Sequence, residues 1–288
     1  MSQINSTLSE EIILKLGVTA FLSSIGVTLN IAELVLLYRI RKYATSNEVY
    51  LASLSVADLV YVLIKPLNFA FYQQNILVRE SAAMATMSAV MNVVFHLLVM
   101  TMDRYIAVHK PFWHKLKINK THALKVCIAA WTITILIATT CITLDWYYDF
   151  QLRRIFGYIK SSLILFSGVC YLTCYSYIIV YVVKKRSNIT QSRQSSQRKV
   201  STASITSWYQ ALNQSEIRTI RMSAAISISF ILLQYPSAIA DLIQSPYSTW
   251  FHMIGLLNCS VDSLIYFFWG SKARLRSHSL QPNTSKKN

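Results

Sequence analysis

Seven apolar stretches, each long enough to cross a lipid bilayer, constrain this chain more than any other feature of its sequence. They cover residues 12–38, 48–72, 81–108, 123–144, 159–183, 219–243 and 250–269. A bilayer core of about 30 Å requires about 20 helical residues. A single spanning segment must also satisfy its own backbone hydrogen bonds, which a helix does and an isolated strand does not. The sequence therefore predicts an all-α membrane protein, a seven-transmembrane-helix bundle built as a single domain over residues 1–288.

The basic residues predict which ends of the helices face the cytoplasm. Of the 28 Lys and Arg, 22 fall in four stretches that follow the first, third, fifth and seventh apolar stretches: residues 39–42, 104–125, 184–221 and 272–287. Cytoplasmic loops of membrane proteins are enriched in Lys and Arg, so we expect an extracellular N-terminus (1–11) and a cytoplasmic tail (271–288). A nucleic-acid-binding protein would gather such charge on one face of a soluble fold, so no nucleic-acid partner is expected.

The segments between and after the apolar stretches carry weaker signals. Residues 184–215, the expected third cytoplasmic loop, are rich in Ser, Gln and Arg and have too few apolar side chains to fold alone. Residues 271–279 predict a short amphipathic C-terminal helix that binds lipids of the inner leaflet. Asn5 begins a glycosylation pattern. Ser195 and Ser201 follow basic residues as kinase substrates do, although such patterns also arise by chance in a Ser-rich segment.

Short motifs occur in order, at matching depths, in all seven stretches. The second contains LASLSVADL, the third ends in MDRYIAV, and the seventh contains DSLIY. Single residues complete the pattern: Asn30, Trp131, Tyr175, Glu216, Phe230, Pro236 and Asn258. Together these resemble rhodopsin-like (class A) G-protein-coupled receptors over the chain apart from its tails and third loop. The resemblance implies a plasma-membrane receptor that is not an enzyme, needs no cofactor, and transduces an extracellular small-molecule or peptide ligand to a heterotrimeric G protein.

Several positions depart from the family pattern. Arg79 stands where the family has one Cys of its extracellular disulfide, and residues 145–160 contain no Cys. Ser167 replaces the fifth-helix proline, Gln234 replaces the sixth-helix Trp, and Asp262 with the following Ser replaces the seventh-helix Asn-Pro pair. Melanocortin-type receptors are similar in lacking that disulfide pattern and that proline and in having Asp in the seventh helix. They are therefore the nearest relatives that we expect.

The resemblance implies a switch at the cytoplasmic ends of the helices. Arg104 would pair with Asp103 at rest and reach Glu216, which lies about 30 Å along the helix before Pro236. Opening of the sixth helix at this end would expose a groove for a G-protein helix. Further residues of the switch and of its sixth-helix hinge are Tyr105, Phe112, Tyr175, Tyr266, Phe230 and Pro236. A position at the membrane interface is the alternative for the ion pair, the two inner Tyr and Phe112.

Asp58 lies in the middle of the second apolar stretch, where a carboxylate costs about 2.5–3.5 kcal/mol. It therefore requires a partner, water or a proton. The resemblance implies an allosteric sodium ion at Asp58, Asn258 and Asp262, with Asn30 in the same polar core. Two alternatives stay open: the two carboxylates share a proton, or the cluster is purely structural. Glu33, one turn from Asn30, is expected only to pack against it.

We expect a ligand pocket in the extracellular half of the bundle. By alignment with the family it is lined by Lys65, Thr86, Gln234, Asp241 and His252. Thr86 stands where aminergic receptors carry an Asp, which disfavours a monoamine, and a Leu stands where opsins carry the retinal Lys. Lys65 would either bind an anionic ligand group or pair with Asp241, and the sequence does not choose between these roles.

Other functions stay open at this stage. A receptor-fold decoy, or a constitutively active orphan without agonist-driven G-protein signalling, is compatible with Gln234 and Ser263. A channel or transporter is a remote alternative, because such proteins usually show inverted repeats or helices broken at the midplane, and the sequence shows neither. The six His are scattered along the chain, so the sequence offers no constellation suited to catalysis or metal binding.

Overall fold

The protein is a bundle of long helices. A computed structural model describes residues 2–39, 45–71, 76–148, 153–195 and 203–271. Within these ranges the elements are α1 (Ser2–Arg39), α2 (Ser46–Ile64), α3 (Leu67–Ala70), α4 (Ile76–His109), α5 (Pro111–Lys117), α6 (Lys120–Tyr147), α7 (Arg153–Ser195), α8 (Ala203–Leu242), α9 (Ser248–Ile265) and η2 (Tyr266–Ser271). Seven of the helices so described, α1, α2, α4, α6, α7, α8 and α9, are long and apolar enough to cross a membrane. The predicted fold class is confirmed, and η2 adds a helical segment after α9.

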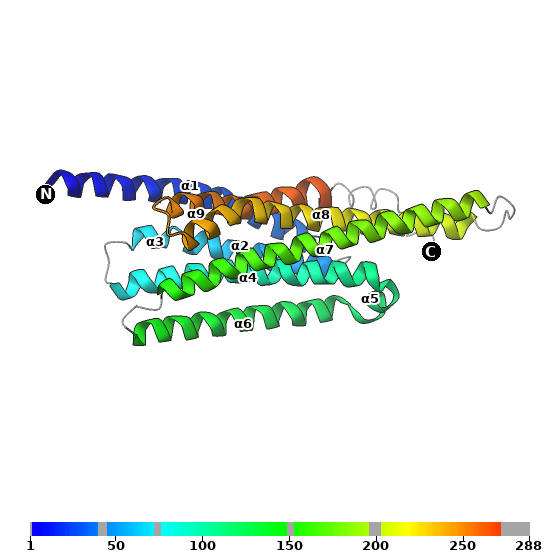
Figure 1. Cartoon of the computed structure of the whole chain (residues 1–288), viewed down its shortest axis with the longest axis horizontal. Helices are drawn as coiled ribbons and strands as arrows, with labels where there is room; N and C mark the ends of the chain where they lie inside the picture. Colours follow the sequence, from blue (N-terminus) through cyan, green and yellow to red (C-terminus); the bar gives the residue numbers. More distant parts are fainter. Residues whose placement is uncertain (1, 40–44, 72–75, 149–152, 196–202, 272–288) are drawn as a thin grey trace, which may run out of the picture.

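The long helices run alternately in opposite directions, which gives the bundle two ends (Figure 1). One end contains the start of α1 and the short helix α3, and we call it the N-terminal end. The other contains α5 and the C-terminal part of α7. We call it the basic end, because Arg39, Lys110 and Lys120 lie in or beside the connections that reach it. Each residue of a spanning helix therefore has a defined depth between these two ends.

Local sequence explains where several helices begin. The Glu48 side chain accepts a hydrogen bond from the Thr45 backbone N–H, a capping-box contact at the start of α2. Pro111 lies in the first turn of α5, where its missing N–H removes no helical hydrogen bond. The Asn119 side chain accepts a hydrogen bond of 2.8 Å from the His122 N–H and caps α6. These contacts fix the points at which the chain re-enters the bundle.

Residues 184–215 differ from the expectation that they form a loop. α7 continues to Ser195 and α8 begins at Ala203, so most of this segment is helical. The chain has no Gly or Pro between Val169 and Tyr235. Extending an existing helix is much easier than starting one. A segment of this composition does not fold alone, but the two flanking helices can still grow into it.

The two terminal segments bear on the predictions for residues 1–11 and 271–279. α1 begins at Ser2, so the N-terminal segment continues the first spanning helix as far as the structure describes it. The amphipathic helix expected over residues 271–279 lies outside the described residues beyond Ser271. Its lipid-binding role therefore stays a prediction.

The interior of the bundle is built around α4, which is the most deeply buried spanning helix. It contacts α2, α6, α7 and α8. α6 lies at the periphery and exposes apolar side chains such as Ile128, Ile133 and Leu136. Lipid already solvates such side chains, so helices in a membrane associate through close packing and polar contacts rather than by burying apolar surface. The polar contacts between these helices therefore carry much of the specificity of the fold.

One such polar network joins α2, α4 and α6 in the interior. The Ser53 hydroxyl lies 2.7 Å from His96 Nε2 and accepts a hydrogen bond of 3.1 Å from Trp131 Nε1. The Thr134 hydroxyl donates to Asn92 Oδ1 at 3.3 Å. The rings of His96 and Trp131 also meet edge-to-face, 5.8 Å apart. Three spanning helices are thereby fixed to one another by groups that hydrocarbon cannot solvate.

Candidate functional site

At the basic end, Asp103 and Arg104 form a buried ion pair near the end of α4. Arg104 Nη2 donates to Asp103 Oδ2, and His114 Nε2 lies 3.0 Å from Asp103 Oδ1. His114 can reach back because α5 starts at Pro111, directly after α4 ends. Both oxygens of Asp103 are therefore engaged, whereas Arg104 Nε is buried without a hydrogen-bond partner among the described residues. Arg104 thus retains a donor for one further partner.

Tyr105, the third residue of the predicted switch, has different neighbours. Its ring stacks on His109, with centroids 5.7 Å apart, and lies 5.6 Å from the ring of Tyr177 on α7. Tyr181 extends the same cluster, 6.1 Å from His109. These four rings join α4 to α7 beside the ion pair, so Tyr105 contributes packing between helices rather than a contact to Arg104.

Tyr175 on α7 and Tyr266 at the start of η2 are buried inside the bundle. Their side chains are 5% and 0% exposed. Such burial excludes the membrane-interface position that the sequence left open for both. Tyr175 is close enough to Arg104 for an electrostatic interaction. It therefore lies beside the ion pair, where α4 and α7 meet.

Other predicted residues lie at the surface or outside the described side chains. Phe112, on α5, is 73% exposed at the basic end. Glu216 lies in α8, but its side chain is outside the described residues. The same holds for the side chains of Asn5 and Ser195 and for the whole of Ser201. The Arg104–Glu216 contact and the modification sites therefore stay predictions.

Pro236 lies inside α8, where it leaves one carbonyl without its helical hydrogen bond. Toward the basic end, Phe230 is fully buried and meets Tyr171 edge-to-face at 6.1 Å. Beside the proline, the Tyr235 hydroxyl donates to an α7 carbonyl at 2.6 Å. This approach requires Gly168, because a Cβ there would lie 1.9 Å from the Tyr235 hydroxyl. α7 and α8 are thus closely fitted at the level of the proline.

The predicted polar core lies between α1, α2, α8 and α9. Asp262 accepts hydrogen bonds from Asn258 Nδ2 at 3.0 Å and from the Ser229 hydroxyl at 3.1 Å. Asn30 donates to a carbonyl of α9 at 3.0 Å and so joins α1 to α9. Asp58 is 1% exposed, and neither of its carboxylate oxygens has a hydrogen-bond partner among the described residues. A carboxylate buried in this way requires a cation, water or a proton.

Glu33 adds a third carboxylate to this core. It is 3% exposed and close enough to Asp58 and Asp262 for electrostatic interactions. No group of three or more His, Cys, Asp or Glu in the described part of the chain is arranged to hold a metal ion by itself. The oxygens of Asp58 and Asn258 are buried without hydrogen bonds there, and carboxylate and carbonyl oxygens are the donors that a hard cation prefers. The core thus holds one more carboxyl group than the sequence interpretation assigned to it.

A cavity of about 1050 Å³ opens at the N-terminal end of the bundle. Four of the five predicted pocket residues line it: Lys65, Thr86, Asp241 and His252. Its volume is at the upper end of the range for small-molecule sites. The Thr86 hydroxyl accepts a hydrogen bond of 2.9 Å from Asn68 Nδ2, which links the wall of the cavity to α3. The cavity and the ion pair therefore lie at opposite ends of the same bundle.

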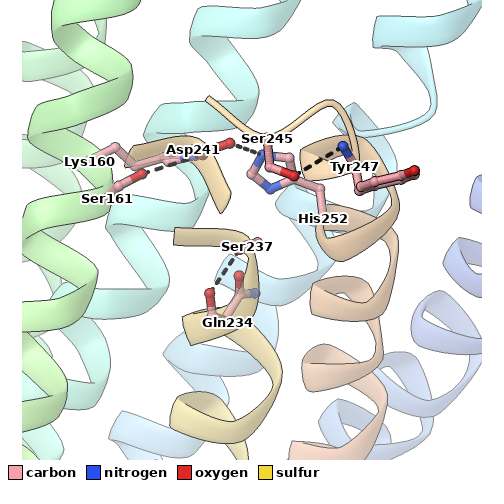
Figure 2. A network of polar contacts seen from close by, with 8 residues as sticks. All are labelled: Lys160, Ser161, Gln234, Ser237, Asp241, Ser245, Tyr247 and His252. Atoms are coloured by element: carbon pink, nitrogen blue, oxygen red, sulfur yellow. Dashed lines mark hydrogen bonds and ion pairs between the residues drawn. The ribbon is translucent and has the colours of Figure 1, made fainter. Parts of the chain in front are cut away.

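Asp241 joins three helices at the wall of this cavity (Figure 2). Lys160 Nζ of α7 lies 2.8 Å from Asp241 Oδ2, and the neighbouring Ser161 hydroxyl donates to the same oxygen at 3.3 Å. His252 Nε2 of α9 lies 3.0 Å from Asp241 Oδ1. Figure 2 shows these side chains approaching Asp241 from two sides. Both carboxylate oxygens thus have partners within the protein, and the sequence predicted neither Lys160 nor the contact with His252.

Gln234 departs from the prediction, because it does not line the cavity. It is 4% exposed and lies deeper in the bundle than Asp241 (Figure 2). Its Nε2 donates to the Gly255 carbonyl at 3.0 Å. A Cβ on Gly255 would lie 2.9 Å from Gln234 Oε1, so this glycine makes room for the amide. Alignment gives the depth of a residue in its helix, whereas the contact with α9 decides where the side chain points.

Sequence reasoning missed several residues of these sites. Arg79, Arg154 and Lys160 line the cavity, while His114 contacts Asp103 and Ser229 contacts Asp262. The three basic residues did carry a signal, because they belong to the six Lys and Arg outside the four basic stretches. No local pattern distinguishes His114 or Ser229 from other residues of their type. Their roles depend on which helices become neighbours.

Comparison with known proteins gives the family. The model of the 7 transmembrane receptor (rhodopsin family) matches residues 29–266, most of the chain. This range contains the ion pair, the polar core and the residues that line the cavity. The match gives no support to the expected melanocortin-type relationship, and no curated protein matches the chain. The chain therefore belongs to the rhodopsin family of seven-transmembrane receptors, and it is a multi-pass membrane receptor of the G-protein-coupled type.

Proposed function

We propose that this receptor couples ligand binding in the N-terminal cavity to a heterotrimeric G protein at the basic end. In this proposal the N-terminal end is extracellular, the basic end is cytoplasmic, and the receptor resides in the plasma membrane. Ligand binding moves the basic end of α8 away from α4 about Pro236, which releases Arg104 and opens a groove for a helix of the G protein. The ligand is a small molecule or a short peptide.

The observation that carries this proposal is the closed ion pair at the basic end. Asp103 and Arg104 are both buried, and Asp103 is held by His114 as well. The two buried charges satisfy each other in this state, and Arg104 Nε is left as a donor for a different partner in a second state. Such an arrangement suits a two-state switch. The proline within α8 supplies a point at which that helix can bend. Phe112, exposed on α5, is suited to docking on the G protein.

We expect Glu216→Ala to raise the basal activation of G proteins two- to fivefold. In the resting state Glu216 would restrain α8 through Arg104, and an interfacial ion pair of this kind is worth up to about 1 kcal/mol, roughly a fivefold change in population. The measurement is the dissociation of a panel of Gα–Gβγ sensors in cells at matched surface expression. It needs no ligand, because basal signalling is the readout.

Ser215→Ala is the matched control, since it shortens a neighbouring polar side chain without removing a charge. It should leave the basal signal at the wild-type level. A Glu216→Ala signal equal to wild type would remove Glu216 from this role. If no sensor responds to any variant, a member of this receptor family that does not signal through G proteins, the receptor-fold decoy, is favoured.

We further propose that the polar core binds a sodium ion at Asp58. Sodium should then stabilise the purified receptor by about 1 kcal/mol relative to a large organic cation at equal ionic strength, a rise in Tm of about 2–4 °C. Asp58→Asn should abolish this difference, whereas Glu11→Gln on the exposed part of α1 should retain it. Equal Tm values of the wild type in both salts would favour the shared proton instead.

A further inference from the structure

We propose that a groove between α7 and α8 at the basic end of the bundle binds an anionic phospholipid. Arg221 binds the phosphate of the headgroup, and the aliphatic wall of the groove binds part of one acyl chain. This site lies on the surface of the bundle, apart from the N-terminal cavity and the Asp103–Arg104 ion pair. The inference therefore goes beyond the proposed function and needs neither its ligand nor its G protein.

The groove is small and aliphatic. α7 and α8 lie side by side at the basic end (Figure 1), and the groove between them has a volume of about 160 Å³. Apart from Arg221, the described residues that line it are Ile178, Ile179, Val182 and Val183 of α7 and Ile217 and Ile220 of α8. Small-molecule sites usually have about 300–1,000 Å³. The groove therefore suits a segment of a flexible hydrocarbon chain better than a compact ligand.

The groove lies at the depth where acyl chains meet lipid headgroups. The apolar span of α7 ends at Lys184 and that of α8 begins at Ile217, so the groove occupies the last turns of both spans. Ile179 and Val183 are 55% and 62% exposed, so the groove opens to the surrounding lipid. Arg221 lies about 6 Å inside the start of the α8 span. From there its long side chain can extend along the helix to the headgroups.

The surroundings of Arg221 contain few acidic residues. Residues 150–215 and 217–240 contain no Asp or Glu. Glu216 lies five residues before Arg221, which is about 140° around α8. Of the ion pairs in the described part of the chain, none includes Arg221. Arg218, one turn away and exposed, adds a second positive charge beside the groove.

The position of Arg221 distinguishes it from the other cations of this end. Topology explains Lys and Arg in the connections between spanning helices, whereas Arg221 lies within a span and lines a groove. The planar fork of its guanidinium matches two phosphate oxygens. In the proposed orientation this leaflet is the inner one, which carries anionic lipids. A sterol would match the aliphatic wall but would leave the guanidinium without an anion.

The lipid in the groove can be identified by photo-crosslinking in nanodiscs that contain one part phosphatidylserine and four parts phosphatidylcholine with identical acyl chains. Val180, which is 65% exposed and does not line the groove, is replaced by p-benzoylphenylalanine in the full-length receptor. On illumination its ketone inserts into a C–H bond of a neighbouring lipid, and mass spectrometry of the adduct identifies the headgroup. Both leaflets have the same composition, so the orientation of the receptor does not affect the result.

Leu124 on α6 is the matched control position for the probe. It is 53% exposed. It lies four residues inside the span that begins at Lys120, just as Val180 lies four residues inside the span that ends at Lys184. Lys120 and Lys125 provide positive charge beside it, but it does not line the groove. Adducts at position 124 therefore report the general attraction of anionic lipid to the basic end.

We expect phosphatidylserine to be enriched about fivefold more in adducts at position 180 than in adducts at position 124, the factor expected for one additional basic residue near the headgroups. Arg221→Gln should remove this difference, and Arg221→Lys should retain most of it. Val182→Phe, which fills the groove without changing its charge, should lower the yield of phosphatidylserine adducts at position 180 severalfold. Lys125→Gln, which removes an exposed cation of α6, should leave position 180 unchanged.

Equal enrichment of phosphatidylserine at positions 180 and 124 would overturn the proposal, and so would an enrichment at position 180 that Arg221→Gln does not change. Adducts with phosphatidylcholine alone would show a groove that accepts any acyl chain, which also contradicts an anionic lipid site. Arg221 is exposed, so its substitution should not prevent folding; if Arg221→Gln is not produced, Arg221→Met takes its place. Because neither agonist nor G protein is present, failure of this proposal is distinguishable from failure of G-protein coupling.

Discussion

Arg104→Ala should reduce G-protein activation by a factor of about 10 to 150 while surface expression stays near the wild-type level. Hydrogen bonds to a charged group are worth about 1.5–3 kcal/mol, and Arg104 has a donor left for a partner in the active state. The substitution leaves Asp103 with His114 at 3.0 Å, so one of its two contacts survives and the receptor should still fold. The loss of signal would then reflect the switch and not the fold.

The measurement is best made in the Glu216→Ala background, which should raise the basal signal and so remove the need for a ligand. Arg104→Lys should recover only part of the signal, since an ammonium group lacks the planar fork of the guanidinium. Lys125→Ala, at an exposed position near the basic end of α6, is the control for a lost cation and should signal normally. Wild-type activation by Arg104→Ala at equal surface expression would count decisively against the proposed switch.

Asp241→Leu should be the most destabilising of the substitutions considered, by about 3 kcal/mol. The substitution removes the carboxylate that lies 2.8 Å from Lys160 Nζ. Because the Lys160 side chain is only 8% exposed, its charge is then buried without this carboxylate. Removing one partner of a buried ion pair costs about 3–5 kcal/mol of stability. Because the cavity beside this pair opens to water, we expect a cost at the lower end of that range. Thermal unfolding in nanodiscs should show a fall in Tm of about 6–12 °C.

The double variant Asp241→Leu with Lys160→Met tests whether the uncompensated Lys160 causes the loss of stability. Replacing both charges by apolar side chains removes the uncompensated ammonium group, and such exchanges are often neutral. The double variant should therefore be more stable than Asp241→Leu alone. If it is equally unstable, the loss arises from the contact between Asp241 and His252 and not from Lys160. If Asp241→Leu unfolds at the wild-type temperature, the bridge between α7, α8 and α9 has little energetic importance.

The sequence by itself determined the class of the protein and the direction of its helices. The apolar stretches must form helices, because hydrocarbon offers the backbone no hydrogen-bond partners and each spanning segment has to satisfy its own N–H and C=O groups. The alternation of basic connections predicts which helix ends share a side. Both are properties of short segments, so neither depends on how the segments pack. The depth of Asp58 and of the Asp103–Arg104 pair follows from position along a helix for the same reason.

Only the tertiary structure decided which side chains meet. Lys160 and Asp241 are 81 residues apart in the chain, and no local pattern pairs them. Likewise, the Gln234 side chain points toward α9 and does not line the cavity, because Gly255 leaves space for it. Four cations that are scattered along the sequence line the same cavity. The rotation and tilt of each helix are set by close packing and polar contacts with its neighbours. Contacts between helices therefore follow from the packed bundle, whereas the existence of the helices follows from the segments themselves.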